Sequence, residues 1–262
     1  MNISFEIILG LVFPYLMTTL GAVTVFLFSR NISRQVQSVF LGFAAGVMIA
    51  ASIFSLLIPA IEEVETSGGV GWFVAAFGFV CGATFLTILD YFLPHQHLNT
   101  DESEGMSSNL SKTSLLMLAV TMHNIPEGIA VGLSFALALF HGDEISLLSA
   151  FALAIGMGIQ NFPEGAAISL PLKSQGKSVK QAFVLGSLSG IVEPIFAFLT
   201  LVLFKYISSM LPFLLSFSAG AMMFVTVEEL IPEAQTESHS HYATFGILAG
   251  FVLMMVFDVA LG

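Results

Sequence analysis

Long apolar runs separated by short polar connections make up most of the chain. A helix that crosses the hydrocarbon core of a bilayer needs about 20 apolar residues. Runs of that kind lie at residues 3–28, 38–61, 70–93, 113–140, 146–170, 180–206, 210–231 and 243–261. The pattern predicts an all-α polytopic membrane protein with eight transmembrane helices. Because the connections leave no room for a separate soluble unit, we expect residues 1–262 to form a single transmembrane domain.

The composition supports a surface that faces lipid. Hydrophobic residues make up 56% of the 262 residues and charged residues only 10%, whereas soluble domains carry roughly 25% charged residues. The net charge of −11, with seven basic residues, argues against a nucleic-acid partner and suits cations. The single cysteine, Cys81, excludes an internal disulfide and a cysteine-rich zinc cluster.

Basic residues fall almost entirely on one side of the predicted bundle. Three connections on that side carry Arg30, Arg34, Lys112, Lys173, Lys177 and Lys180, and only Lys205 falls on the other side. Cytoplasmic loops of membrane proteins carry an excess of Lys and Arg. We therefore predict that these loops are cytoplasmic and that both termini are extracytoplasmic. The expected location is the plasma membrane, which is the inner membrane in a bacterium.

Two of the predicted cytoplasmic loops, at about 94–112 and 232–242, contain histidines and acidic residues. The histidines are His95, His97, His239 and His241. Such loops either bind metal ions with low affinity or are flexible polar connections. The sequence leaves both interpretations open.

Ionisable and amide residues inside the predicted spans form three short motifs. Span four contains His-Asn-Ile-Pro-Glu-Gly from His123, span five contains Gln-Asn-Phe-Pro-Glu-Gly from Gln160, and span six contains Val-Glu-Pro around Glu193. An ionisable residue inside a span costs roughly 2.5–3.5 kcal/mol on insertion scales. His123 and Glu127 are four residues apart and share one helix face, as do Gln160 and Glu164. Each helix therefore offers nitrogen and oxygen donors at mid-membrane depth.

A proline lies beside each of the three glutamates. Pro126, Pro163 and Pro194 have no backbone N–H, so the carbonyl four residues earlier in each helix loses its usual donor. Irregular backbone at this depth is tolerated only beside protein, water or a ligand. The repeated Pro-Glu-Gly in two antiparallel spans also predicts an inverted repeat about an axis in the membrane plane.

The donor set favours a divalent transition metal. One imidazole, three carboxylates and several amide oxygens suit zinc, iron, manganese or cadmium, and the lack of thiolates disfavours copper(I). One divalent ion neutralises two of the three carboxylates Glu127, Glu164 and Glu193. The sequence therefore predicts a buried site for a transported cation, with zinc foremost and no catalytic cofactor.

The three motifs together resemble the signature of the ZIP family of zinc/iron-regulated transporters, and the ending Met-Met-Val-Phe-Asp-Val-Ala-Leu-Gly resembles its GufA-like branch. The resemblance covers essentially the whole chain. It implies a central pair of spans four and five, inward metal movement and an elevator-like slide of part of the bundle. It also implies an exit site at Glu228 and Glu229 and an entrance residue at Asp258. The implied two-metal transport site consists of His123, Asn124, Glu127, Gln160, Asn161, Glu164 and Glu193. Some relatives carry aspartate in place of Asn161, so the second metal is the less secure of the two.

Several alternatives remain open at this point. The amides could bond across helices without binding metal, and Glu228, Glu229 and Asp258 could be solvated helix ends. A passive metal-selective channel could use the same ligands as a carrier. A membrane-embedded metalloenzyme is disfavoured because the His-Glu-x-x-His string of zinc proteases is absent. A carrier of anionic organic solutes is disfavoured because no Lys or Arg lies near the middle of a span. Metal preference, ion coupling and a homodimeric state are not determined by the sequence.

Overall fold

The computed structural model describes residues 4–27, 33–92, 112–174, 176–235 and 241–261, and these residues form helices and short connections without a strand. The helices are α1 (Phe5–Leu27), α2 (Arg34–Ala51), α3 (Ile58–Thr66), α4 (Gly71–Phe92), α5 (Lys112–His141), α6 (Glu144–Ser174), α7 (Val179–Ser189), α8 (Val192–Ile207), α9 (Leu211–Val225), α10 (Ile231–Ala234) and α11 (Tyr242–Leu261). Two π-helical segments, η1 (Ser52–Leu57) and η3 (Thr226–Leu230), and one 3₁₀ turn, η2 (Ser208–Met210), join consecutive helices.

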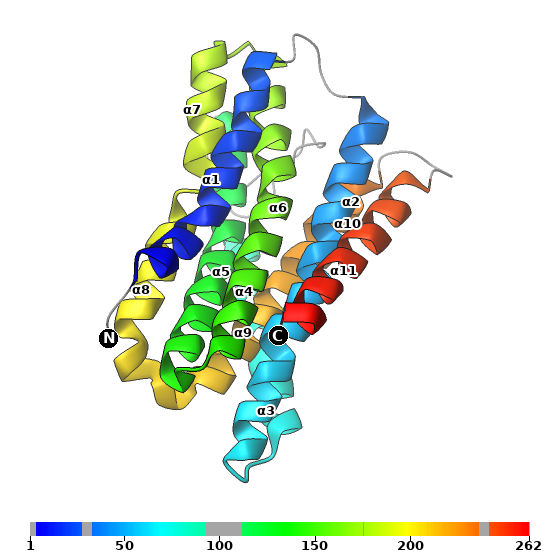
Figure 1. Ribbon diagram of the computed structural model, residues 1–262. Coiled ribbons are helices and arrows are strands. Elements are labelled where there is room, and N and C mark those ends of the chain that lie inside the picture. Colours follow the sequence, from blue (N-terminus) through cyan, green and yellow to red (C-terminus); the bar gives the residue numbers. More distant parts are fainter. Residues whose placement is uncertain (1–3, 28–32, 93–111, 175, 236–240, 262) are drawn as a thin grey trace.

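The all-helical membrane fold predicted from the sequence is confirmed, but the number of spans is not. The described residues contain seven helical runs long and apolar enough to cross a membrane. One of them, Val179–Ala234, is 56 residues long, far more than the roughly 20 residues that one crossing needs. It contains both predicted spans 180–206 and 210–231. The chain turns at η2, near the lower end of α8 in Figure 1, so two crossings within this run remain a prediction.

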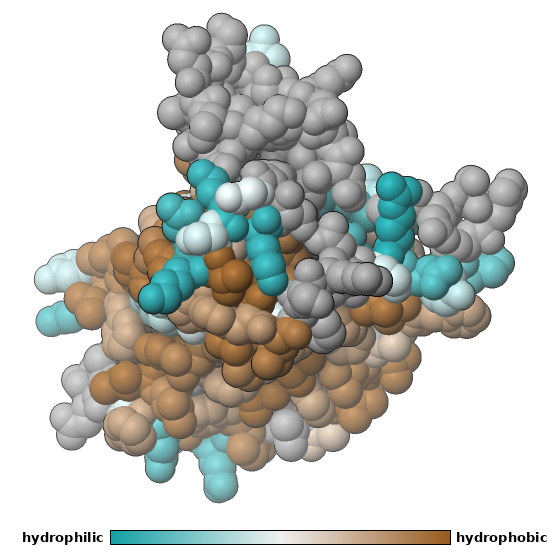
Figure 2. All heavy atoms as spheres, turned by 90° about the horizontal axis from the view of Figure 1, so that it is seen from above, coloured by the Kyte–Doolittle hydropathy of each residue, from teal (hydrophilic) through white to brown (hydrophobic). Residues whose placement is uncertain are grey.

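The outer surface is largely apolar. Large hydrophobic side chains project outward along α4, among them Trp72, Phe77 and Tyr91, which are 67%, 57% and 73% exposed. Apolar residues cover most of the coloured surface in Figure 2. In water this surface would be strongly unfavourable, whereas hydrocarbon requires it.

The helices form two groups. The motif group consists of α1, α5, α6, α7 and α8, in which α1 packs mainly against α6 and α5 against α8. The glycine group consists of α2, α3, α4, α9 and α11, in which α2 packs mainly against α11 and α4 against α9. Figure 1 shows the motif group on the left and α2 and α11 on the right. Packing between the groups is thinner and involves chiefly α6 against α2 and α11, and α5 against α9.

The glycine group contains an inverted repeat. Gly82 of α4 lies directly against the backbone of Phe217 on α9, and Gly250 of α11 lies in the same way against the backbone of Phe43 on α2. In Figure 1, α2 runs downward and α9 upward. The helices α4 and α11 share the form Gly-x3-Gly-x7-Asp, at Gly78, Gly82 and Asp90 and at Gly246, Gly250 and Asp258. The α2–α11 pair is thus repeated upside down by the α9–α4 pair.

The two π-helical segments follow the same repeat. η1 extends α2 and η3 extends α9, and each is followed by a proline at the second residue of the next helix, Pro59 and Pro232. A π-segment inserts one extra residue into the helical hydrogen-bond register, and such insertions are frequent at functional sites. Ser55 lies in η1, and Glu228 and Glu229 lie in η3.

Candidate metal centre

The predicted motif residues come together inside the motif group. α5 contributes Asn124 and Glu127, and α6 contributes Gln160, Asn161 and Glu164. Glu193 lies in the first turn of α8. Apart from the half-buried Glu164, these side chains are at most 3% exposed. Charged and amide groups therefore gather where no bulk water reaches them.

A chain of hydrogen bonds joins two of the carboxylates. The Gln160 amide donates to Glu127 Oε1 at 3.0 Å and also to the side-chain oxygen of Asn161. Asn161 Nδ2 in turn donates to Glu193 Oε2 at 2.6 Å. Two adjacent amides of α6 thus hold the glutamates of α5 and α8 on either side of them.

Three glutamates lie close together in this cluster. Glu164 lies close enough for its charge to act on both Glu127 and Glu193. Two buried oxygens, Glu127 Oε2 and Asn124 Oδ1, accept no hydrogen bond from the described part of the chain. A buried carboxylate oxygen without a donor costs free energy unless a cation or proton meets it. Oxygen donors of this kind suit a divalent metal ion.

The break between α7 and α8 positions Glu193. α7 ends at Ser189, whose carbonyl accepts a hydrogen bond from Asn124 Nδ2 at 3.1 Å. α8 begins at Val192, with Pro194 in its first turn. Of the three predicted irregularities, this is the one at which the helix is interrupted; α5 and α6 continue through Pro126 and Pro163. Glu193 consequently lies at a helix N-terminus, which carries a partial positive charge.

Sequence reasoning missed one residue of the cluster, Thr18 on α1. Its hydroxyl is fully buried and lies 3.4 Å from Glu193 Oε1. The backbone of Thr18 lies directly against Gly165 of α6, where a side chain would not fit. The available signal was a hydroxyl one turn after Pro14 in an apolar run, with Gly21 one turn later. That signal is weak, because such a threonine also bonds to its own helix, as Thr18 does to the Pro14 carbonyl at 3.3 Å.

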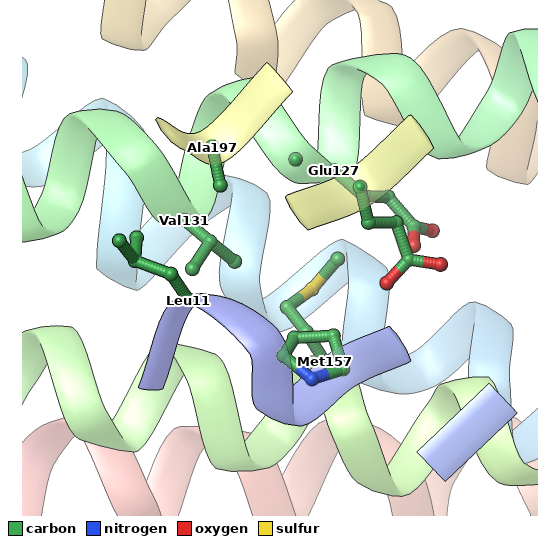
Figure 3. Close-up of a pocket in the computed structure, with 8 residues that line it drawn as sticks. Leu11, Glu127, Val131, Met157 and Ala197 are labelled. Carbon is green, nitrogen blue, oxygen red and sulfur yellow. The ribbon is translucent and has the colours of Figure 1, made fainter. Parts of the chain in front are cut away.

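Apolar side chains close one end of the cluster. A small pocket with no room for a water molecule is lined by Glu127, Leu11, Val131, Met157 and Ala197, among others. In Figure 3 the carboxylate of Glu127 lies at one end of this pocket, and Leu11, Val131 and Ala197 lie toward the other. Val131 is one helical turn nearer than Glu127 to the end of α5 at His141. The cluster is therefore sealed from that end of the bundle by apolar contacts.

An open vestibule lies toward the His141 end of α5, lined by residues of η1, α3, α5, α6 and α11. It has a volume of about 620 Å³, and its polar lining includes Ser55, Glu62, Glu63, His141 and Asp258. Ser55 Oγ donates to Asp258 Oδ1 at 2.6 Å. Asp258 is only 9% exposed. The alternative prediction that it is a solvated helix end is therefore wrong. His141 was not singled out by the sequence analysis.

The other predicted residues are placed less completely. The side chain of His123 lies outside the described residues, although α5 places its backbone one turn before Glu127. His95, His97 and His239 also lie outside them. His241 is exposed and contacts the ring of Phe245, Glu228 is exposed and Glu229 is buried. Among the described side chains, no three His, Cys, Asp or Glu residues are arranged to hold a metal.

Comparisons with known proteins agree with the resemblance in the motifs. Residues 95–258 match the family model described as ZIP Zinc transporter. The chain is 34% identical to the human zinc transporter ZIP11, with 98% of both chains covered. It is 38% identical to the zinc transporter GufA of Myxococcus xanthus, with 94% of both chains covered. It is 37% identical to the zinc transporter ZIPB of Bordetella bronchiseptica, with 97% of this chain and 81% of that protein covered.

Proposed function

Because the chain belongs to the ZIP zinc transporter family, in its GufA-like branch, we propose that it carries zinc across the membrane through the buried cluster of the motif group. The observation that carries this proposal is the convergence of Glu127, Glu193 and Glu164 around the amides of α6. Three carboxylates in an apolar interior need a cation or protons, and a divalent ion is the cargo named for the relatives.

The amides give zinc a defined way to bind. In the present hydrogen-bond network Gln160 and Asn161 point N–H groups at the two glutamates. An amide oxygen, not its nitrogen, ligates zinc. Gln160 or Asn161 therefore ligates the ion only after its amide rotates. An amide that does not rotate continues to support the carboxylates by hydrogen bonding. His123, one turn from Glu127, would supply the imidazole ligand. A second ion between Asn124, Asn161 and Glu193 belongs to the same proposal.

The apolar seal favours a carrier over an open channel. Leu11, Val131, Met157 and Ala197 fill the space beside Glu127 and leave no room for water, and in this proposal an ion reaches the cluster only when helices move. The thin packing between the two helix groups supports a slide of the motif group past the glycine group. Both groups belong to the single transmembrane domain that the whole chain forms. In this proposal the protein lies in the plasma membrane with both termini facing outward. Zinc enters from the vestibule past Asp258 and leaves into the cytoplasm near Glu228 and Glu229.

Metal uptake into proteoliposomes tests the proposal. Uptake of zinc, iron, manganese and cadmium is compared for the parent protein and for Glu127→Ala, Glu164→Ala and His123→Ala. Glu6→Ala, at an exposed position in the first turn of α1, is the matched control for removal of a glutamate. We expect zinc uptake by the parent and the control and its near-complete loss in the three variants. Normal uptake by Glu127→Ala and Glu164→Ala together would overturn the proposal.

A further inference from the structure

A histidine and a glutamate face each other at the mouth of the vestibule. His141 is the last residue of α5 in the motif group, and Glu63 lies on α3 in the glycine group. His141 Nε2 lies 3.0 Å from Glu63 Oε2, and the two side chains are 38% and 23% exposed. Both residues line the vestibule that also contains Ser55 and Asp258. The pair is thus open to water on the path that leads to the cluster.

The other ring nitrogen of His141 has a defined protonation state. Its Nδ1 lies 3.3 Å from the Ser146 hydroxyl oxygen. That hydroxyl donates its only proton to Asp143 Oδ2 at 2.7 Å, and the Ser146 backbone N–H donates to Asp143 Oδ1 at 2.8 Å. Asp143 thus accepts from Ser146 through both of its carboxylate oxygens. The Ser146 oxygen can therefore only accept from His141, and Nδ1 carries the hydrogen.

With this assignment, a neutral His141 ring would place two acceptors face to face. In a neutral imidazole with hydrogen on Nδ1, Nε2 presents a lone pair, and that lone pair faces a carboxylate oxygen. Two acceptors at 3.0 Å repel each other unless a positive centre lies between them. That centre is a proton when the ring is an imidazolium, or a metal ion when the ring is neutral.

The geometry suits a metal ion. Zinc binds imidazole nitrogen and carboxylate oxygen at about 2.0–2.2 Å in tetrahedral sites, which places the two ligand atoms about 3.3 Å apart. The observed separation needs only a few tenths of an ångström of adjustment at exposed side chains. Histidines that ligate metals usually donate their second N–H to an oxygen that is itself fixed. The Ser146–Asp143 pair provides that support here.

We propose that His141 and Glu63 form a capture site for a hydrated divalent metal ion, zinc foremost, at the mouth of the vestibule. The site deepens the proposed function, on which its role in transport rests. Water completes the coordination, because no third His, Cys, Asp or Glu within the described ranges is arranged with this pair to hold a metal. Two protein ligands give weak, fast-exchanging binding, as delivery to a deeper site requires.

Zinc binding in a protein that lacks the deeper cluster tests the site separately from transport. In a Glu127→Gln/Glu164→Gln background, titration calorimetry in detergent is expected to detect weak zinc binding to which the vestibule contributes one site. His141→Ala or Glu63→Gln should weaken it at least about tenfold. Glu65→Gln, the same change two residues along α3 at an exposed position outside the vestibule lining, should leave it intact. Equal zinc binding with and without His141 would overturn the proposal and leave a proton-bridged ion pair.

Two further measurements protect the test against a misfolded background. In the otherwise unchanged protein, His141→Ala should raise the KM for zinc uptake about threefold or more while the maximal rate is kept. His141→Cys should bind cadmium more tightly than zinc, because a thiolate is a softer ligand, and a purely structural contact would give no such reversal. If uptake fails in every form but this binding persists, the capture site stands and the transport proposal falls. An unchanged KM and no cadmium preference would sink the capture site alone.

Discussion

The two helix groups differ in how they use their buried positions. In the motif group, buried positions hold Glu127, Gln160, Asn161 and Glu193, whose hydrogen bonds run from helix to helix. Glycines lie directly against the backbone of the facing helix in both groups, as at Gly165 in the motif group and at Gly82 and Gly250 in the glycine group. Polar networks in an apolar interior are costly when partly satisfied, whereas glycine contacts bring backbones together without polar atoms. The difference between the groups is therefore the buried polar cluster, which the motif group adds to a glycine packing that both groups share.

The largest expected effect is loss of transport from one side-chain change in the motif group. Glu193→Gln keeps the size of the side chain but removes a charge and an acceptor oxygen for Asn161. Mutation of a residue that only hydrogen-bonds to a metal ligand typically lowers metal affinity or activity 10–100-fold. We therefore expect zinc uptake to fall about 100-fold with the thermal midpoint little changed. Uptake into proteoliposomes and thermal unfolding in detergent measure the two effects. Uptake within threefold of the parent would break the assignment of chemistry to this group.

Substitution of glycines in the glycine group should lower thermal stability, and by similar amounts in the α4–α9 pair and in the α2–α11 pair. Gly82→Ala and Gly250→Ala each place a methyl group against facing backbone, and such overpacking typically costs about 1–3 kcal/mol. We expect comparable falls in the thermal midpoint for the two variants, on the order of 5 °C. Thr87→Ala, on the exposed side of α4, is the matched control and should change the midpoint little. A large fall in only one glycine variant would contradict the inverted repeat.

A change of charge inside the motif group should alter metal stoichiometry. Asn161→Asp replaces the donor to Glu193 with a fourth carboxylate, so the pair of acceptors needs a cation between them. We expect the affinity of the second zinc position to increase about tenfold, and the number of zinc ions bound per chain at sub-saturating zinc to rise accordingly. Calorimetry and metal analysis of the purified protein measure both quantities. Asn161→Ala is the control, and a similar gain of metal in that variant would argue against a ligand role for the new carboxylate.

The smallest expected effect lies at the vestibule floor. Asp258→Asn keeps an oxygen to accept the Ser55 hydrogen bond and removes only the charge. We expect the KM for zinc uptake to rise about threefold with an unchanged maximal rate, because charge in a wet cleft concentrates cations without fixing them. Ser55→Ala, which keeps the carboxylate, should raise the KM less. Equal KM values for the parent and Asp258→Asn would remove Asp258 from the entry path.

The sequence predicted much of the fold because membrane helices are specified by length and hydrophobicity. The first span, predicted at 3–28, is observed as α1 (Phe5–Leu27). The connection between spans six and seven was predicted at 207–209, and the chain turns there at η2 (Ser208–Met210). The π-segments η1 and η3 leave no mark in composition, because they insert one residue into a hydrogen-bond register that the neighbouring helix determines.

The candidate site was predictable only where a motif recurs. The repeated Pro-Glu-Gly pointed to α5 and α6, and the structure brings Glu127, Gln160, Asn161 and Glu193 together; their role as metal ligands stays a prediction. Thr18 was missed because a threonine in an apolar helix has the same local pattern whether or not it faces a carboxylate. His141 was missed because its partner lies 78 residues earlier in the chain. Both roles arise from tertiary contacts, which local sequence patterns do not encode.

In the proposed transport site, the interruption between α7 and α8 would make the three glutamates unequal when the ion departs. The N-terminus of α8 offers Glu193 a partial positive charge worth roughly 0.3–1 kcal/mol or somewhat more when partly buried. Glu127 and Glu164 lie within continuous helices and have no such standing compensation. Without the ion, Glu193 would therefore stay ionised at a lower free-energy cost than the other two glutamates. Glu127 and Glu164 would then determine the affinity for the next ion. A metal site with this partial positive charge at one glutamate would release its ion more readily than a site with three equivalent carboxylates.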